Sequence, residues 1–244
     1  MKKLIIYGAT SQIALEFINL NIHKLDKISV FVRDKKKFYL LFEKYCKKVL
    51  DQKNKIIIFE EDIIDLKKNL SIIETFNNYE FDGLLFLVGH TGNPEKEFKN
   101  SEACIENYNI NLIHPVNIIN ALTDKLKDNS FICVFSSVAG IRGRSLRLFY
   151  CSAKAGLISY LSGLRQKLNK RNILVQNFIA GYMSTEKFVY KAPKFLISTP
   201  EKISRKILSS ILKKQTNVYS SNLWFLISLI IKFIPEFIFK KLKF

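Results

Sequence analysis

The sequence is poor in the residues that cross-link a chain, hold metals or divide it into pieces. Its 244 residues include 4 cysteines, 3 histidines, 5 prolines and 9 glycines. The cysteines form no C-x-x-C pair and no cluster with histidine at metal-ligand spacing, which argues against a metal site and a disulfide framework. No proline- or glycine-rich linker and no internal repeat divides the chain, so we expect one domain, long enough to hold a core without cross-links.

Acidic residues are also scarce. Lysine and arginine number 39 against 21 aspartates and glutamates, which gives a formal net charge of +18. Such a balance suits a nucleic acid, an anionic membrane surface or a phosphorylated ligand. The sequence has no arginine-rich segment of the kind that binds a nucleic-acid groove, and no aromatic pair of the RNP type. We therefore expect no nucleic-acid partner. Only four apolar residues separate Lys3 from Gly8, so we expect no secretory signal and predict a reduced, cytoplasmic protein with free buried thiols.

Short apolar runs alternate with longer stretches of helical period. The runs are rich in Ile, Val and Phe and apolar on both faces, as buried parallel strands are. They are Leu4–Tyr7, Ile28–Val32, Ile56–Phe59, Leu84–Val88, Ile132–Phe135 and Leu174–Phe178. The stretches that predict helices are Ala14–Asn21, Lys36–Leu50, Leu66–Asn77, the region Ser101–Lys127, and Ala153–Lys170. This alternation predicts an α/β fold, a single Rossmann-type domain with a doubly wound parallel sheet.

The last quarter of the chain has a different character. Pro200–Lys214 predicts a helix and Asn217–Ser220 an edge strand, which would complete an α/β domain of residues 1–221. Residues 222–244 form an apolar and basic helical extension. Its run Trp224–Phe239 is too short and too interrupted to span a bilayer. Three roles stay open for the extension: a cover over the substrate cleft, a dimer contact, or an anchor on an anionic membrane surface.

Gly8 follows the first predicted strand and begins the sequence Gly-Ala-Thr-Ser-Gln-Ile-Ala. A turn between a strand and a helix offers backbone N–H groups to a pyrophosphate at the positive end of the helix dipole. Glycine is favoured where the backbone approaches phosphate closely. Of the three glycines in a G-x-x-x-G-x-G pattern only the first is present, with Gln12 and Ala14 at the other positions. We still predict nucleotide binding here, by Gly8, Thr10, Ser11, Gln12 and Ile13.

The end of the second predicted strand indicates which dinucleotide binds. An acidic residue there selects NAD through the adenosine ribose, whereas arginine pairs with a 2′-phosphate. Arg33 is followed by Asp34 and then by three lysines. Asp34 could instead bind the ribose and select NAD(H). Arg33 and the three lysines nevertheless favour NADP(H) over NAD(H).

Ser137, Tyr150 and Lys154 give the strongest chemical signal. Tyr150 and Lys154 are four residues apart, so they share one face of a helix. A tyrosine with a pKa near 10 is a poor acid at neutral pH, and a neighbouring ammonium lowers that pKa. Ser137 lies at the end of the fifth predicted strand, where its hydroxyl would hydrogen-bond a substrate carbonyl oxygen.

The segments Gly8–Ser11 and Val134–Gly140, together with Tyr150 and Lys154, resemble the short-chain dehydrogenase/reductase family over nearly the whole chain. The resemblance implies ketone reduction, with Tyr150 as the proton donor and Ser137 positioning the oxygen. It implies that Lys154 lowers the tyrosine pKa and binds the nicotinamide ribose.

The same resemblance adds further residues and a partner. Asn111, in Asn-Ile-Asn-Leu, matches the asparagine that supports a proton-relay water. A homo-oligomer is implied by family habit. The implied cofactor contacts, beyond those of the glycine turn, come from Arg33, Asp62, Gly89, Tyr150, Lys154, Gly181 and Thr185.

Three segments resemble one branch of the family more narrowly, the decaprenylphosphoryl-2-keto-ribose (erythro-pentofuranosid-2-ulose) reductases. These are Val88–Asn93, Ser136–Arg144 and the tryptophan-to-lysine run at the end of the chain. This resemblance implies a keto sugar carried on a phosphate or polyprenyl phosphate, in cell-envelope polysaccharide synthesis. Two alternatives stay open: a reductase of a 3-oxoacyl or other lipid ketone, and a non-catalytic NADP-binding regulator. A regulator needs no proton donor, so the presence of both Tyr150 and Lys154 disfavours the non-catalytic alternative.

Overall fold

A parallel sheet of seven strands organises the chain. The computed structural model describes residues 3–76, 80–185 and 192–242. The strand order is β3-β2-β1-β4-β5-β6-β9, and all neighbouring strands pair in parallel. The strands are β1 (Lys3–Tyr7), β2 (Lys27–Val32), β3 (Ile56–Glu60), β4 (Phe81–Phe86), β5 (Leu126–Ser137), β6 (Leu174–Ala180) and β9 (Asn217–Tyr219). The order reverses between β1 and β4, which confirms the predicted Rossmann-type fold and predicts ligand binding at the carboxyl ends of the strands there.

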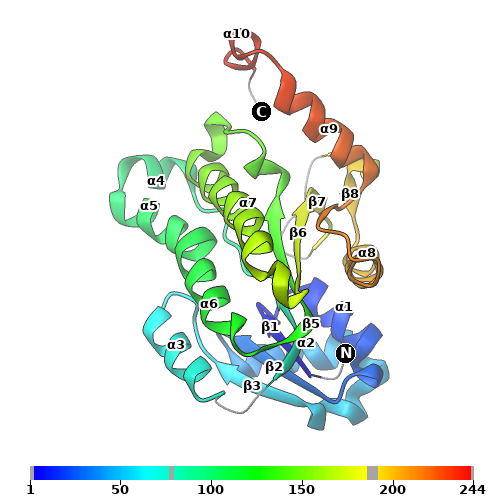
Figure 1. The fold of residues 1–244 in the computed structure, drawn as a ribbon. Helices are drawn as coiled ribbons and strands as arrows, with labels where there is room; N and C mark the ends of the chain where they lie inside the picture. The colour runs from blue at the N-terminus through cyan, green and yellow to red at the C-terminus, as the bar shows by residue number, and fades with distance from the viewer. Residues whose placement is uncertain (1–2, 77–79, 186–191, 243–244) are drawn as a thin grey trace.

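Helices cover both faces of the sheet (Figure 1). One face carries α1 (Gln12–Asn21), α2 (Lys35–Tyr45) and α8 (Pro200–Leu212). The other carries α3 (Leu66–Glu74), α6 (His114–Thr123) and α7 (Leu148–Leu168). Successive residues of β1 enter opposite cores: Leu4 and Ile6 pack under α1, whereas Ile5 and Tyr7 pack on the α7 side. This is why the strands are apolar on both faces.

Two predicted helices differ from the structure. The stretch Lys36–Leu50 forms α2 only to Tyr45, and 3₁₀ turns over Lys47–Lys55 follow. The helix ends at its C-cap Cys46, whose ψ of 32° is not helical, although Val49 further on is buried at helical spacing, so apolar spacing alone was misleading. The region 101–127 forms α5 (Ser101–Tyr108), a π-helical turn (Asn109–Ile113) and α6, and its end belongs to β5. The final residue of the predicted helix Leu66–Asn77 lies outside the described residues.

The C-terminal extension consists of two helices, α9 (Asn222–Phe233) and α10 (Glu236–Phe239). Pro235 separates them because the residue before a proline avoids the helical conformation, and Ile234 is extended. A further short helix, α4 (Pro94–Lys99), precedes α5, with Asn93 as its N-cap. Within the described parts of the chain, no helix has the length and apolar character needed to cross a bilayer.

Candidate active site

Tyr150 and Lys154 lie one turn apart near the start of α7. The Lys154 Nζ atom is 5.9 Å from the centroid of the Tyr150 ring. Lys154 is 2% exposed, and Nζ donates to the Phe135 carbonyl oxygen at 3.3 Å. Burial lowers the pKa of Lys154 to about 8. The ammonium has three N–H donors, and Phe135 is its one hydrogen-bond partner among the described residues, so it can bind a further polar group.

Ser137 ends β5 and begins the loop that packs on this turn of α7. Its Oγ caps the following 3₁₀ turn by accepting from the Ala139 N–H at 3.1 Å. Across the sheet Ser137 pairs with Ala180 of β6. A Cβ on Gly140 would lie 2.8 Å from the Lys154 carbonyl carbon, so the loop touches the α7 backbone directly. Because Gly140 has no side chain, the loop packs directly on the turn of α7 that carries Tyr150 and Lys154. Ser137 therefore lies at the same end of the sheet as these two residues.

Asn111 lies in the π-helical turn and is fully buried. Its Oδ1 accepts from the His90 N–H at 3.1 Å, and its Nδ2 donates to the His90 carbonyl at 2.7 Å. A Cβ on Gly89 would lie 3.4 Å from Lys154 Nζ and 3.6 Å from Asn111 Oδ1, so Gly89 lies between these two side chains. Single π-turns inside helices are frequent at functional sites, and this one places Asn111 beside Lys154.

Glu97 and Asn107 extend this cluster, and the sequence analysis missed both. Asn107 accepts from Asn111 Nδ2 at 2.9 Å through Oδ1 and donates to Glu97 Oε1 at 2.7 Å through Nδ2. Glu97 is 5% exposed, which is rare for a carboxylate without a buried partner. Gly92 has a φ of +69°, and a Cβ there would overlap Glu97 Oε1 at 1.5 Å. The sequence signal that could have revealed Glu97 is Gly92, just before the Asn-Pro start of α4. Only glycine allows the Glu97 carboxylate to lie so close to the backbone there.

The glycine turn is built around one residue whose backbone has a positive φ. Gly8 has a φ of +79°, and a Cβ there would lie 3.1 Å from the Leu87 carbonyl carbon. Ser11 caps α1 by accepting from the Ala14 N–H at 3.1 Å. Gln12 Nε2 donates to the Tyr45 hydroxyl at 2.6 Å, and Ile13 is buried in the core under α1. The turn therefore presents backbone N–H groups, with Thr10 half-buried beside them, rather than a set of binding side chains.

Arg33 and Asp34 have different surroundings. Arg33 is exposed at the end of β2. Asp34 is the N-cap of α2, and its Oδ1 accepts from the Lys37 N–H at 2.8 Å. The carboxylate that competes with Arg33 for the ribose therefore already has a structural role.

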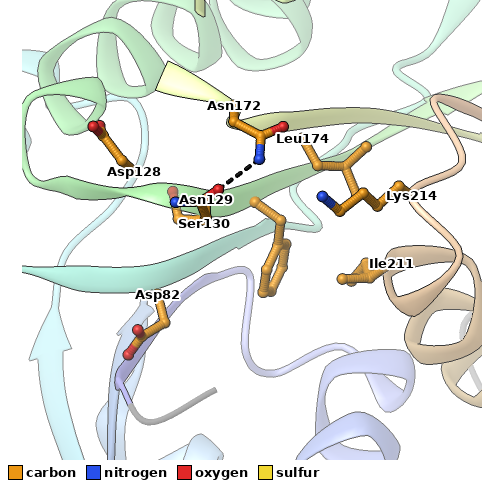
Figure 2. Close-up of a pocket in the computed structure, with 9 residues that line it drawn as sticks. Asp82, Asp128, Asn129, Ser130, Asn172, Leu174, Ile211 and Lys214 are labelled. Atoms are coloured by element: carbon orange, nitrogen blue, oxygen red, sulfur yellow. Dashed lines mark hydrogen bonds between the residues drawn. The ribbon is translucent and has the colours of Figure 1, made fainter. Parts of the chain in front are cut away.

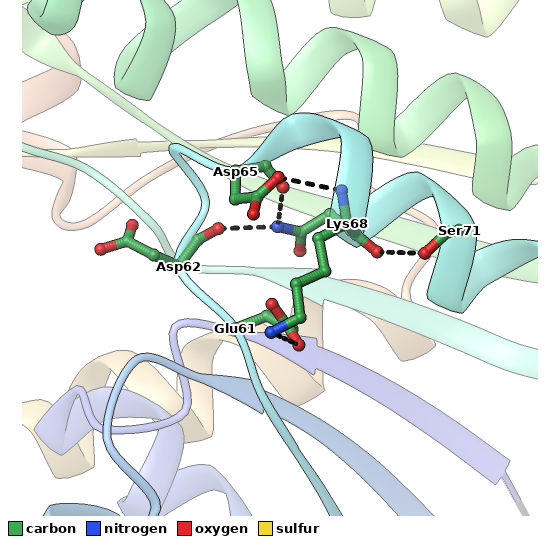
Figure 3. A network of polar contacts seen from close by, with 6 residues as sticks. Glu61, Asp62, Asp65, Lys68 and Ser71 are labelled. Atoms are coloured by element: carbon green, nitrogen blue, oxygen red, sulfur yellow. Dashed lines mark hydrogen bonds and ion pairs between the residues drawn. The ribbon is translucent and has the colours of Figure 1, made fainter.

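Asp62 lies in a polar network after β3 (Figure 3). Its Oδ1 accepts from the Ile64 N–H at 3.1 Å and its backbone carbonyl from Asn69 Nδ2 at 2.7 Å. The neighbouring Glu61 pairs with Lys68 at 2.8 Å. These contacts fix the turn after β3, where the family resemblance implies a cofactor contact by Asp62.

Gly181 and Thr185 follow β6, where the structure adds a neighbour that we did not expect. A Cβ on Gly181 would lie 2.1 Å from Trp224 Nε1, so this glycine makes room for the indole of α9. The Gly181 N–H donates to Ser220 Oγ at 3.0 Å. Thr185 Oγ1 is buried and has no hydrogen-bond partner among the described residues, so this atom is open to a polar ligand.

These residues fit a nicotinamide dinucleotide. The Gly8 turn suits the pyrophosphate, Arg33 a 2′-phosphate, Lys154 the ribose, and the unpaired Thr185 hydroxyl the carboxamide end. Whether each of the predicted side chains touches the cofactor stays a prediction.

The pocket of about 210 Å³ in Figure 2, with a mixed polar and apolar lining, lies elsewhere. Asp82, Asn129, Asn172 and Lys214 line it, at the amino ends of β4, β5 and β6. It is therefore at the opposite edge of the sheet from the turn of α7 that carries Tyr150 and Lys154.

Comparison with known proteins identifies the family. The family model described as short chain dehydrogenase matches residues 2–194. The chain therefore belongs to the short-chain dehydrogenase family of oxidoreductases.

Solved structures agree with this fold. A short-chain dehydrogenase from Burkholderia cenocepacia J2315 in complex with NADP has a TM-score of 0.76, at 15% identity over 94% of this chain and 93% of that one. A short-chain dehydrogenase from Streptomyces avermitilis has a TM-score of 0.77, at 15% identity over 93% and 91%. Among curated proteins, the ketoacyl reductase HetN of Nostoc sp. is 28% identical over 118 residues. That alignment covers 46% of this chain and 41% of HetN, less than half the length of either protein.

Proposed function

We propose that the protein reduces a ketone to a secondary alcohol, with Tyr150 as the acid. The observation that carries the proposal is the convergence of Tyr150 and Lys154 of α7, the Ser137 loop and Asn111 at one end of the sheet. NADPH, when bound, supplies the hydride that the carbonyl carbon takes up. Tyr150 then gives its phenolic proton to the carbonyl oxygen, while the Ser137 hydroxyl hydrogen-bonds that oxygen.

Lys154 and Asn111 support the acid. The Lys154 ammonium lowers the free energy of the phenolate that remains after proton transfer. Asn111, which borders the same space at Gly89, helps to return a proton to Tyr150.

We propose NADP(H) as the preferred cofactor. Arg33 is exposed and cationic, while Asp34 is engaged as a helix cap, so the guanidinium is the better placed of the two for a 2′-phosphate. The Burkholderia cenocepacia structure contains NADP and the similar protein BdcA was solved with NADPH, in agreement with this preference.

The proposed substrate is a keto sugar linked to phosphate or polyprenyl phosphate, used in cell-envelope polysaccharide synthesis. The net charge of +18 favours a phosphorylated ligand, and the exposed apolar side chains of α9 favour a lipid-linked one. A 3-oxoacyl or other lipid ketone is the second candidate, favoured by the similarity to HetN. We place the protein in the cytoplasm, as a homo-oligomer in peripheral contact with the inner face of the membrane.

A substrate panel tests this proposal. Purified protein is mixed with NADPH and, in separate reactions, a prenyl-phosphate keto sugar, a nucleotide keto sugar and a 3-oxoacyl thioester, and NADPH oxidation is followed. We expect the highest kcat/KM with the prenyl-phosphate keto sugar. Preference for the thioester would move the assignment to lipid ketones, and NADPH binding without turnover of any ketone would favour a regulator.

A further inference from the structure

The end of the chain exposes an unusual amount of apolar surface. Of the twenty large hydrophobic side chains that the described residues expose, nine lie in residues 222–242. Phe233 is 74% exposed and Phe237 is 66% exposed. We call these nine the apolar tail surface: Leu223, Phe225, Leu226, Leu229, Ile230, Phe233, Phe237, Ile238 and Leu242. A helix that is apolar on nearly all sides is normally buried or in contact with lipid, so this surface needs an occupant.

Only a narrow face of α9 packs on the domain. Trp224 and Ser228 are its buried residues. The Trp224 indole donates to the Leu196 carbonyl at 2.8 Å and meets the Tyr182 ring edge-on. This contact fixes the start of α9 next to Gly181 and turns the rest of the helix outward.

Arg142 fixes the other end of α9. Its guanidinium donates to the carbonyls of Ile231 (3.0 Å) and Ile234, pairs with Glu236 at 2.6 Å and stacks 3.8 Å above the Phe239 ring. Arg142 belongs to the loop that follows Ser137, so α9 and α10 are bound to the active-site loop. Figure 1 shows both helices extending beyond the sheet layers, away from α1 and α2.

The charges of the tail indicate its occupant. Lys232, Lys240 and Lys241 are exposed, while Glu236 is paired with Arg142. Because Glu236 is paired with Arg142, a symmetric contact between two tails would offer these lysines no unpaired acid from the tail of the other copy. A bilayer with anionic headgroups accepts both the apolar side chains and the lysines.

We propose that the apolar tail surface inserts into the interface of an anionic bilayer and holds the active-site loop at the membrane surface. The proposal deepens the proposed function, since it brings the site to the place where a lipid-linked ketone resides. Membrane binding is measured without turnover, so the two proposals fail independently.

Vesicle flotation with the full-length protein tests the surface. We expect wild type to float with vesicles of phosphatidylcholine and phosphatidylglycerol, and at least tenfold less with phosphatidylcholine alone. Phe233→Glu should lower the bound fraction at least tenfold. Leu40→Glu is the matched control, because Leu40 is 68% exposed on α2, outside the tail, and should leave flotation unchanged.

Circular dichroism and NADPH binding confirm that both variants fold. Wild-type protein that fails to float with either vesicle, or Leu40→Glu that loses as much binding as Phe233→Glu, would overturn the proposal. So would a dimer in solution that Phe233→Glu dissociates, because a second copy would then be the occupant.

A separate observation concerns the buried chain from Glu97 to Asn111. A side-chain amide has a donor end and an acceptor end, so an isolated asparagine can be turned either way. An ionised carboxylate only accepts, so Glu97 orients the Asn107 amide group toward itself and the Asn107 oxygen toward Asn111 Nδ2. The His90 backbone also holds Asn111, through an N–H that donates to Oδ1 and a carbonyl that accepts from Nδ2, and Asn107 Oδ1 adds a side-chain contact to the same amide.

We infer that Glu97 is a positioning residue for Asn111. Glu97→Gln keeps the shape but can turn its own amide, so the carboxylate no longer fixes the Asn107 oxygen toward Asn111 Nδ2. We expect kcat to fall about tenfold, the factor that one hydrogen bond supplies, with NADPH affinity and Tm unchanged. The double variant Glu97→Gln/Asn107→Asp restores an acceptor-only group next to Asn111 and should recover most of kcat.

A space-filling role predicts a different result. If Glu97→Gln keeps the wild-type kcat, or if the double variant is no better than the single one while Tm stays unchanged, the orienting role is wrong.

Discussion

The two halves of the carboxyl edge of the sheet are built from different chemical groups. On the nucleotide side, at β1 and β2, the turn offers backbone N–H groups, and one positive-φ glycine shapes it. On the predicted catalytic side, at β4 to β6, side chains converge, and two of them, Asn111 and Lys154, are buried. A backbone site tolerates changes such as Gln12 and Ala14, whereas a side-chain site depends on each residue type. The difference explains why a degenerate glycine motif accompanies an intact catalytic set.

The largest expected effect belongs to the catalytic side. Lys154→Met should lower kcat/KM for ketone reduction by roughly 10²–10⁴-fold, the usual contribution of acid–base chemistry. The same variant should raise the free energy of unfolding at pH 7 by about 3 kcal/mol, because the pKa of the lysine falls from 10.5 to about 8 on folding. Urea unfolding and steady-state assays measure the two changes. If the Lys154→Met protein were no more stable than wild type, contacts in the folded protein would already offset the free-energy cost of burying the ammonium.

The pH dependence follows from the same group. Above pH 8 Lys154 loses its proton, so kcat/KM of wild type for ketone reduction should fall as pH rises through 8. Because the pKa of Lys154 is lower in the folded chain, the unfolded chain binds more protons between pH 8 and 10.5, and stability contributed by this group rises with pH there. Lys154→Met should lack that rise, which a comparison of Tm values at pH 7.5 and 9.5 would detect.

The nucleotide side is tested at its one special backbone position. Gly8→Ala should weaken NADPH binding about tenfold and destabilise the fold by about 1–3 kcal/mol, since its φ of +79° disfavours a side chain. Gly163→Ala is the control, because Gly163 lies in α7 with open space around it and alanine favours a helix. Equal effects of the two variants would argue against a shaped phosphate turn.

Cofactor choice should respond less strongly. Arg33→Ala should raise the Kd for NADPH about fivefold and leave the Kd for NADH unchanged, since an exposed ion pair contributes about 1 kcal/mol at most. Fluorescence titration with both cofactors measures this. An equal loss for NADPH and NADH would show that Arg33 does not distinguish them.

The smallest effect is expected at Asp34. Asp34→Ala removes the N-cap of α2 and should cost about 1 kcal/mol of stability without changing the preference for NADPH over NADH. A gain in NADPH preference would instead give Asp34 a part in cofactor selection.

Much of the fold could be predicted because the strands are buried on both faces and therefore continuous in apolar residues. The proximity of Tyr150 and Lys154 was also predictable, since four-residue spacing on one helix is local information. Boundaries such as the end of α2 were not, because the chain leaves the helix at Cys46 while Val49, further on, is still buried at helical spacing.

The contacts of Glu97, Arg142 and Trp224 could not be predicted, since they join parts of the chain that only the fold brings together. Trp224 changes the interpretation of Gly181, which the family resemblance assigns to the cofactor. In the structure this glycine also accommodates the indole, because a Cβ would lie 2.1 Å from Trp224 Nε1.

Tyr150→Phe tests the central claim most directly. The substitution removes the phenolic hydroxyl and keeps the ring that lies 5.9 Å from Lys154 Nζ. NADPH affinity, measured by fluorescence, should stay within about twofold of wild type, whereas ketone reduction should fall by roughly 10²–10⁴-fold. A Tyr150→Phe protein that binds NADPH and reduces the ketone at the wild-type rate would contradict the account.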